Sequence, residues 1–318
     1  MLPDQTLTTG PVEGGTAQPA VGAAPERLSQ RSKIEMLLFI VPAFLFQLLW
    51  GWYPVLIAFY LAFTNATIKP GKSVLPAWIG VQNFIRLYHD PLVIKAFQVT
   101  VTYAVMAIIL TFVVPILVAI LLMEMPPRVM RWMMLLWFLP LSGVASTILW
   151  RYMYNARYGM FQYIIKILGL PQQLFLNDPQ LILFWLIFPG ILLFGPGLIY
   201  MAALQSVPSS YYEAAEIEGA SFWRKIWTIS LPRIRPVIAM MLTFAIIGSL
   251  QEFSWLQIMT GPTGEPGGNA RTLVMYIYMP LWNQMRLGDA TALAVAIFVV
   301  IMVVTIIYRL LFKEDPDA

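Results

Sequence analysis

Six apolar runs are the feature that most limits what this chain can fold into. Each is long enough to cross the hydrocarbon core of a bilayer as a helix, which takes about 20 residues. They cover roughly residues 36–63, 96–123, 132–153, 181–204, 237–260 and 290–311. Only 11% of the 318 residues are charged, against about 25% in a typical soluble domain. The sequence therefore predicts an all-α, polytopic membrane protein with six transmembrane helices.

The first apolar run contains Pro42, Gly51 and Pro54, so we expect its helix to be kinked or tilted. Residues 1–33, by contrast, are rich in Gly, Pro, Ala and Thr and contain few large apolar side chains. A segment of that composition cannot bury enough surface to fold. We expect a disordered N-terminal tail, followed by a membrane domain over residues 34–318.

Lys and Arg are distributed unevenly between the segments that connect the spans. Six spans place both termini on one side of the membrane, together with residues 124–131 and 205–235. The density of Lys and Arg on that side is nearly twice the density on the other side. Because basic loops stay in the cytoplasm, we expect both termini and residues 205–235 to be cytoplasmic.

The composition also excludes several kinds of chemistry. The chain has no cysteine and a single histidine, His89, so it offers no disulfide, thiolate metal site or histidine cluster. Gly71-Lys72-Ser73 matches the end of a phosphate-binding loop, but Ala66 stands where the first glycine of that motif would be. We expect no catalytic residue, metal or cofactor, and no nucleic-acid partner.

The segment "YYEAAEIEGASFWRKIWTISLPRIRP" (211–236) is charged and helix-prone, although it lies between two predicted spans. Ser210 and Glu213 have the spacing of a capping box at the start of a helix. Gly219 permits a bend between two short helices, and we expect Leu231-Pro232 to end the second one. Local properties alone leave an amphipathic linker at the lipid interface as an equal alternative.

The spacing within this segment resembles the EAA loop of binding-protein-dependent ABC importer permeases. Every fixed position of that motif is present, and the matching residues are Glu213, Ala214, Ala215, Gly219, Ile229, Leu231 and Pro232. The resemblance implies that residues 205–235 form a cytoplasmic loop of coupling helices. In that family the loop docks in a cleft of the ATP-binding subunit, so the resemblance assigns these seven residues to coupling.

Four other segments resemble the carbohydrate branch of the family, namely residues 39–65, 78–103, 250–261 and 276–294. Two places depart from that branch. The stretch "TGPTGEPGGNART" (260–272) is longer than the usual Thr-x-Gly-Gly-Pro, and Met279-Pro280-Leu281-Trp282 replaces the usual Ala-Phe. The C-terminus lacks the Lys-Gly ending that is common in the second permease of such pairs. The chain therefore resembles a first permease.

The resemblance also implies partners and a location. The expected partners are a second, homologous permease in a heterodimer, two ATP-binding subunits, an extracytoplasmic solute-binding protein and membrane lipid. The expected location is the cytoplasmic (inner) membrane of a bacterium or archaeon.

Glu252 is the only Asp, Glu, Lys or Arg that falls well inside a predicted span. An ionisable side chain at that depth usually faces a cavity or a partner. In a continuous helix, Gly248, Gln251, Glu252 and Trp255 would share one face. That face would combine the aromatic, amide and carboxylate groups that sugars need. We interpret it as part of a substrate pathway; the alternative is a packing face on which Glu252 bonds to a neighbouring helix.

Phe194 and Gly195 begin the stretch "FGPG" (194–197) and are a second pathway candidate. Glycine and proline break helix regularity there, and broken helices often line substrate sites in transporters. Close packing of helices is an equal alternative.

The sequence thus predicts the membrane subunit of an ATP-driven importer of a sugar or oligosaccharide, with ATP hydrolysis in a partner. An ion-driven secondary transporter is a competing interpretation, but it would need more intramembrane charges or inverted repeats. A membrane enzyme would need paired carboxylates or histidines at one depth. A non-sugar cargo such as glycerol-3-phosphate stays open as an alternative.

Overall fold

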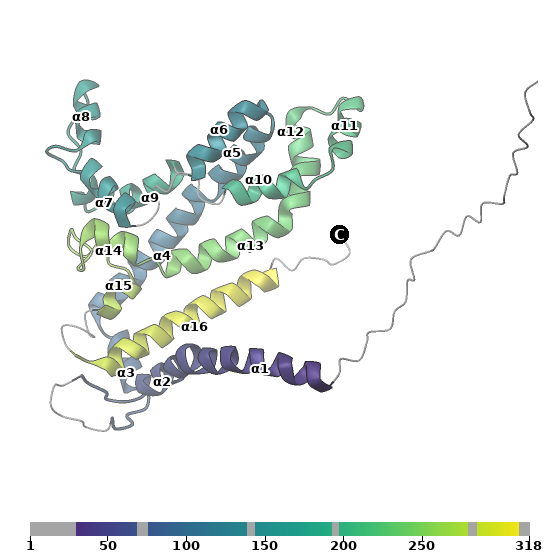
Figure 1. Ribbon diagram of the computed structural model, residues 1–318. Coiled ribbons are helices and arrows are strands. Elements are labelled where there is room, and N and C mark those ends of the chain that lie inside the picture. Colours follow the sequence, from purple (N-terminus) through teal and green to yellow (C-terminus); the bar gives the residue numbers. More distant parts are fainter. Residues whose placement is uncertain (1–29, 69–75, 139–143, 193–196, 279–284, 312–318) are drawn as a thin grey trace, which may run out of the picture. The chain divides into compact units, whose positions relative to one another are not determined.

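The computed structural model describes residues 30–68, 76–138, 144–192, 197–278 and 285–311, whose regular elements are helices (Figure 1). Five stretches are long and apolar enough to cross a membrane: Leu37–Ala62, Pro91–Met123, Ile182–Gln205, Phe222–Leu250 and Leu287–Leu310. The third predicted span, 132–153, is represented by α6 (Pro127–Phe138) and α7 (Val144–Met153), and residues 139–143 lie outside the described ranges. The prediction of an all-α, polytopic membrane protein is confirmed.

The chain is divided after Val55 into two compact units. The first contains α1 (Gln30–Gln47), the π-helical turn η1 (Leu48–Trp52) and the start of α2 (Tyr53–Ala62). Because α1 begins at Gln30, the last four residues assigned to the predicted tail are helical. Residues 1–29 lie outside the described part of the chain.

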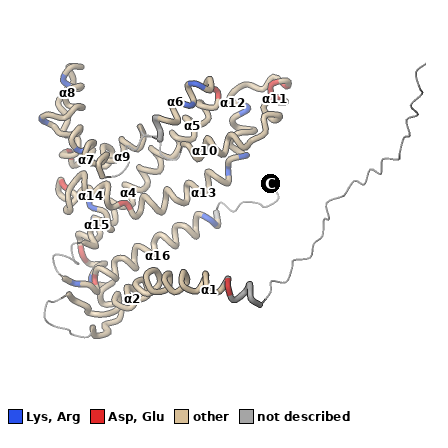
Figure 2. The backbone as a smooth tube through the Cα atoms, viewed as in Figure 1, with Lys and Arg blue, Asp and Glu red and all other residues tan. Residues whose placement is uncertain are grey.

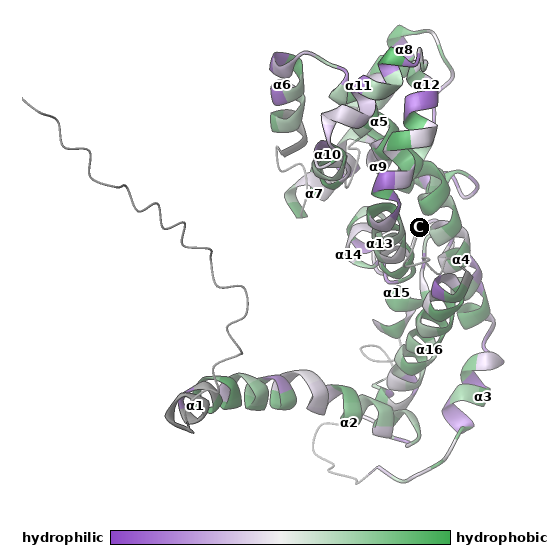
Figure 3. Ribbon diagram, turned by 90° about the vertical axis from the view of Figure 1, so that its right-hand side faces the viewer, coloured by the Kyte–Doolittle hydropathy of each residue, from purple (hydrophilic) through white to green (hydrophobic). Residues whose placement is uncertain are grey.

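The second unit contains the other long helices. These are α4 (Pro91–Thr111), α5 (Val113–Met123), α9 (Ile182–Leu192), α10 (Gly197–Gln205), α13 (Leu231–Leu250) and α16 (Leu287–Leu311). Helix α4 packs against α9 and α13, α5 packs against α10, and α13 also contacts α16. The Lys, Arg, Asp and Glu residues of α4, α13 and α16 lie near the ends of these helices (Figure 2), and apolar residues dominate their middle turns (Figure 3).

Shorter helices connect the long ones. They are α3 (Gln82–Tyr88), α8 (Met160–Ile167), η2 (Phe175–Asn177), α11 (Ser209–Ile217), α12 (Phe222–Lys225), the π-helical turn η3 (Ile226–Ser230), α14 (Ser254–Thr260) and α15 (Leu273–Tyr278).

Each of the two π-helical turns ends two residues before a proline. The N–H of Tyr53 donates to the carbonyl of Leu48, five residues earlier, and Pro54 follows. In the same way, the N–H of Leu231 donates to the carbonyl of Ile226, five residues earlier, and Pro232 follows. A proline ring has no N–H and clashes with the carbonyl four residues earlier. The wider π turn shifts the hydrogen-bond register before the ring, so the helix continues past it.

The helix therefore runs without a break from α12 through η3 into α13. The prediction that Leu231-Pro232 ends a helix is wrong, because Pro232 lies in the first turn of α13. The continuous helix at the fifth predicted span therefore covers Phe222–Leu250, so it starts earlier and ends earlier than the predicted 237–260.

Three clusters of buried side chains hold the second unit together. The α5–α10 cluster joins these two helices to η3 and α13 and includes Tyr200 and Ile234. The aromatic cluster joins α4, α7, α9 and α14 around Tyr154 and Phe175. The α16 cluster joins α2, α3, α4 and α15 to α16 around Ala292.

Polar side chains tie α2 and α3 to the start of α16. Asn83 is buried, and its side-chain nitrogen donates to two carbonyls at the end of α2, both at 2.8 Å. The buried carboxylate of Asp289 pairs with Arg86 at 3.2 Å and with Arg286. At Gly288 a Cβ would collide with the backbone that follows α2. This arrangement gives a structural reason for Asn83 in the segment 78–103 and for Gly288 and Asp289 in the segment 276–294.

The loop between α14 and α15 is held in shape by its own hydrogen bonds, although its sequence departs from the usual pattern. The Glu265 carboxylate accepts from the Gly267 N–H at 2.9 Å and from the Thr263 hydroxyl at 3.0 Å, which lowers the pKa of Glu265 below its ordinary value. Arg271 donates to the carbonyl of Thr263 at 2.8 Å. At Gly264 a Cβ would collide with the backbone of Arg271.

Candidate functional site

The charged segment 205–235 folds as a short helix, a tight turn and a second helix. The first helix, α11, begins at Ser209 after an extended Pro208, with no side-chain cap. The predicted capping box of Ser210 and Glu213 is not formed, because Ser210 already lies inside the first turn. Proline supplies the helix start here, since the residue before a helix needs extended backbone.

Gly219 makes the turn that ends α11. Its φ of +74° is a left-handed conformation that favours glycine. The N–H of Ala220 donates to the carbonyl of Ala215 at 2.8 Å, and that of Gly219 to Glu216 at 3.0 Å. These two bonds form a Schellman motif. The predicted bend at Gly219 is confirmed, and no neighbouring atom would crowd a Cβ there, so the requirement for glycine is conformational.

Two side-chain contacts join the helices on either side of the turn. The Lys225 Nζ donates to the Glu216 carboxylate at 2.8 Å, and the Tyr212 and Ser230 hydroxyls lie 3.1 Å apart. Tyr212, Lys225 and Ser230 also line a cavity of about 150 Å³ next to the end of α5. The angle between the two helices is thus set by the turn and by the two contacts Lys225–Glu216 and Tyr212–Ser230.

The outward side of α11 carries the first part of the motif. Glu213 and Ala214 lie four and three residues before Ile217, so each is a neighbour of Ile217 on the helix surface. All three are exposed, and Ile217 is 89% exposed. On the second helix Trp223 and Trp227, four residues apart, are exposed as well. Large apolar side chains gathered on a surface indicate a protein or membrane contact.

The inward side of the second helix is anchored in the membrane-spanning part of the chain. Ile226 and Ile234 are buried in the α5–α10 cluster, and Phe222 and Leu231 pack against it. Ile229 is half-buried. The second helix is therefore packed against α5, α10 and α13 through one common core.

The opposite end of α13 differs from the sequence expectation. The helix ends at Leu250, and α14 begins only at Ser254. The predicted single helical face of Gly248, Gln251, Glu252 and Trp255 is therefore wrong. The Gln251 N–H closes the helix end by bonding to carbonyls of the last turn, at 3.1 and 3.2 Å.

Glu252 binds the backbone at the break between α13 and α14. Its carboxylate oxygen Oε1 accepts from the backbone N–H groups of Phe253 at 3.1 Å and Trp255 at 3.2 Å. These are donors at the start of α14, which have no partner within the helix. The Glu252 carbonyl accepts from the buried Thr272 hydroxyl at 3.1 Å. The packing alternative expected a bond to a neighbouring helix, but the carboxylate bonds within its own segment.

Trp255 joins α14 to α9. Its indole N–H donates to the carbonyl of Leu186 at 2.9 Å. One residue earlier in α9, the carbonyl of Trp185 accepts from the Tyr154 hydroxyl at 2.9 Å. Pro189 lies four residues after Trp185 and has no N–H for that carbonyl, so Tyr154 supplies the missing donor. Burial raises the pKa of Tyr154 above its usual range.

The predicted pathway residues thus have different surroundings. Gly248 and Gln251 are exposed, with no atom within 4 Å of a Cβ at position 248. Glu252 and Trp255 are half-buried and hydrogen-bonded as described. Phe194 and Gly195 lie outside the described residues.

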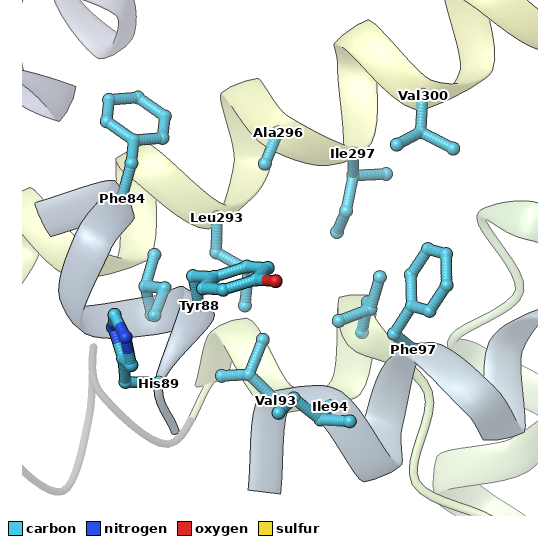
Figure 4. Close-up of a pocket in the computed structure, with 12 residues that line it drawn as sticks. Phe84, Tyr88, His89, Val93, Ile94, Phe97, Leu293, Ala296, Ile297 and Val300 are labelled. Atoms are coloured by element: carbon cyan, nitrogen blue, oxygen red, sulfur yellow. The ribbon is translucent and has the colours of Figure 1, made fainter. Parts of the chain in front are cut away.

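An apolar cavity lies elsewhere, between α3, α4 and α16. It measures about 680 Å³ and is lined by apolar side chains such as Phe97, Leu293 and Ile297. Figure 4 shows these side chains around the space, with the His89 ring at the left and the Tyr88 ring across the middle, its hydroxyl pointing away from His89. A sugar needs many hydrogen-bonding groups, so this cavity does not suit one.

Sequence reasoning missed the two ion pairs of the buried Asp289 carboxylate at the start of α16. Asp289 lies one residue before the predicted span, so it was not considered a buried charge, and its partners Arg86 and Arg286 are partly exposed residues of connecting segments. The sequence signal that could have indicated this buried carboxylate was the position of Asp289 directly before the apolar run 290–311. In the described ranges no group of three or more His, Asp and Glu residues could hold a metal.

Comparisons with known proteins agree with this architecture. The family described as "Binding-protein-dependent transport system inner membrane component" matches residues 97–314. The sulfoquinovosyl glycerol transport system permease protein SmoG of Agrobacterium fabrum is 31% identical over 87% of this chain and 90% of its own. The trehalose/maltose transport system permease protein MalF of Thermococcus litoralis is 29% identical over 85% and 91%.

Among solved structures, the chain resembles one from a bacterial alginate ABC transporter in complex with an alginate pentasaccharide-bound periplasmic protein. The TM-score is 0.76 at 25% identity, and the match covers 91% of this chain and 98% of that chain.

Proposed function

The chain belongs to the family of binding-protein-dependent transport system inner membrane components, and on that premise we propose that it is the permease subunit of an ABC importer for a sugar or oligosaccharide. The similar proteins named above are transport permeases for glycosides, disaccharides or a polysaccharide. Their names support a carbohydrate cargo, and they do not single out one sugar.

The segment 205–235 is the coupling segment on which an ATP-binding subunit docks. The observation that carries this proposal is the exposed α11 face of Glu213, Ala214 and Ile217, one tight turn away from a helix that continues into α13. The α11 face provides a surface for docking, and the buried side of the second helix transmits the movement. An amphipathic linker on lipid is disfavoured, because Glu213 and Glu216 would be repelled by anionic headgroups.

The complete importer contains a second, homologous permease, two ATP-binding subunits and an extracytoplasmic solute-binding protein. ATP is hydrolysed in the ATP-binding subunits, and this chain contributes half of the translocation path. It lies in the inner membrane with both termini and residues 205–235 in the cytoplasm.

The cargo passes the break between α13 and α14. A helix that stops inside an apolar run leaves backbone groups to be satisfied, which is tolerated where the chain lines a cavity. Gln251 offers an exposed amide there, and Trp255 offers an aromatic ring. Glu252 keeps the two helices in register by binding the start of α14.

Uptake by the reconstituted complex tests this function. Vesicles carrying both permeases and the ATP-binding subunits would be given a panel of radiolabelled sugars, the solute-binding protein and internal ATP. We expect uptake of at least one sugar that stops without ATP or without the binding protein. A control with a hydrolysis-deficient ATP-binding subunit should be inactive. Uptake driven by an ion gradient without ATP would contradict the proposal and favour a secondary transporter.

A further inference from the structure

We propose that α8 (Met160–Ile167) is a membrane-surface helix, with its outward face buried in the lipid headgroup region on the side of the bilayer opposite residues 205–235. This inference concerns contact with lipid, and it goes beyond the proposed transport function.

One side of α8 is fixed to the rest of the second unit. Phe161 and Ile165, four residues apart, pack against the aromatic cluster. The Phe161 ring centroid lies 5.2 Å from that of Tyr154, 5.8 Å from that of Trp150 and 6.3 Å from that of Phe175. The position of α8 relative to α7 and α9 is therefore set by a packed core.

The hairpin that follows α8 adds backbone restraints. Gly169, with φ of +69°, ends the helix in a Schellman motif, in which Leu170 donates to Ile165 at 3.1 Å. The chain then returns alongside the helix, where the Gln172 amide donates to the carbonyl of Ala156 at 3.1 Å. These contacts hold α8 in one orientation.

A second side of α8 is apolar and uncovered. Tyr163 is 66% exposed and Ile167 is 67% exposed, and Met160 and Ile164 on the same side are exposed too. At 100° per residue these four side chains adjoin the buried side of Phe161 and Ile165. Gln162 and Lys166 form only a narrow polar strip on the remaining side. About half of the apolar surface of α8 is not covered by this chain. Such a surface is favourable when another apolar phase removes it from water.

The depth of α8 identifies that phase as lipid. The ring of Phe161, which packs α8 against the aromatic cluster, contacts two other rings. One is that of Trp150 in the last turn of α7, and the other is that of Phe175, just before the candidate span Ile182–Gln205. One span separates this level from residues 205–235, so α8 lies where helices leave the opposite face of the membrane. Figure 1 shows α8 running across the direction of α13, as a helix in the membrane plane does.

Tyrosine and lysine side chains at this level match a bilayer boundary. The rings of Tyr152 and Tyr158 lie 5.4 Å apart and both side chains are exposed, as is Tyr163 on α8. Tyrosine is enriched at the membrane–water interface, and Lys166 on the polar strip can extend its ammonium group into water while its stem lies on apolar surface.

The absence of cysteine from the chain makes a direct test possible. The single variants Tyr163→Cys and Ile167→Cys would be labelled with an environment-sensitive fluorophore in the assembled complex in lipid vesicles. The matched control is Gln172→Cys, an exposed polar position on the same hairpin; it removes the amide contact to Ala156 but leaves the packing of Phe161 and Ile165 that anchors α8. We expect blue-shifted emission at positions 163 and 167, with several-fold stronger quenching by lipids spin-labelled near the headgroup than by iodide, and the reverse at position 172.

Two results would overturn the proposal. Iodide quenching at positions 163 and 167 as strong as at 172 would show that the face is in water. Protection from both quenchers would show that protein covers it. If the Tyr163→Cys complex does not assemble, Met160→Cys on the same uncovered side replaces it in the measurement. Transport by the complex is recorded in parallel, so that a failure of the proposed function is recognised separately.

Discussion

The two ends of α13 are built in opposite ways. At its start the helix passes Pro232 without a break, because the π turn η3 rearranges the hydrogen bonds before the ring. At its far end the helix stops after Leu250, although no proline is near and the sequence stays largely apolar. A strong local helix breaker is thus accommodated at one end, and at the other end a carboxylate accepts hydrogen bonds from the backbone N–H groups that follow the helix.

Under the proposed function, this difference corresponds to two tasks. We propose that the continuous end transmits a displacement from segment 205–235 into the α5–α10 cluster. The interrupted end exposes Gln251 and positions α14 against α9 through Trp255. The first end should therefore be sensitive to changes in backbone conformation, and the second to the loss of particular hydrogen bonds.

Gly219→Val should have the largest effect and tests the continuous end. A left-handed conformation costs a non-glycine residue about 1–2 kcal/mol, and a β-branched side chain adds to that, so the turn after α11 should open. We expect import to be lost while ATP hydrolysis continues without coupling, measured as the ratio of uptake to hydrolysis in vesicles.

The matched control for that variant is Gly169→Val. Gly169 has nearly the same φ, a Schellman motif and no crowding, but lies on the α8 hairpin. It should leave the ratio of uptake to hydrolysis unchanged. Equal losses in both variants would mean that the effect comes from folding rather than from coupling.

Glu252→Leu should have the next largest effect and tests the interrupted end. Leucine cannot accept the N–H groups of Phe253 and Trp255, and loss of such a cap costs about 0.5–2 kcal/mol. We expect most uptake to be lost. Glu252→Gln keeps a carbonyl acceptor and should retain part of the uptake of a neutral sugar. Full uptake by the Glu252→Leu variant would show that transport does not need the hydrogen bonds of Glu252.

Trp255→Phe should have a smaller effect. It keeps an aromatic ring but loses the donor to the Leu186 carbonyl, and one hydrogen bond is worth about 1 kcal/mol. The midpoint of thermal unfolding of the complex should fall slightly. Trp185→Phe is the control, because the indole nitrogen of Trp185 is buried without a hydrogen-bond partner within the described residues. An equal fall in both variants would assign the effect to ring volume.

Lys225→Met should have the smallest effect. It removes the ion pair with Glu216, whose side chain is 61% exposed, and pairs screened by water contribute about 0.2–1 kcal/mol. We expect a slight loss of coupling that disappears at high salt. The control is Arg224→Met at the adjacent, exposed position, which should show no salt-dependent loss of coupling. A large effect that does not depend on salt would point to packing of the lysine stem instead.

Hydropathy predicted most of the fold, because the need for about 20 apolar residues per span leaves few alternatives. The bend at Gly219 was also predictable, since its left-handed conformation is a local property of one residue. The capping box was not formed, because Pro208 shifted the helix start by one residue. Periodicity could not reveal the break at Glu252, since the partners of that residue depend on where α14 packs against α9.

The most direct test of the coupling proposal uses single cysteines on the α11 face. Ala214→Cys and Ile217→Cys would be exposed to a water-soluble maleimide, with and without the ATP-binding subunits, and to a cysteine-directed photo-crosslinker. Gln172→Cys on the other side of the membrane is the control. The account predicts that the ATP-binding subunits protect positions 214 and 217 from labelling, leave 172 unaffected, and are captured from 214 or 217. Equal labelling of all positions with and without those subunits, and no crosslink, would contradict it.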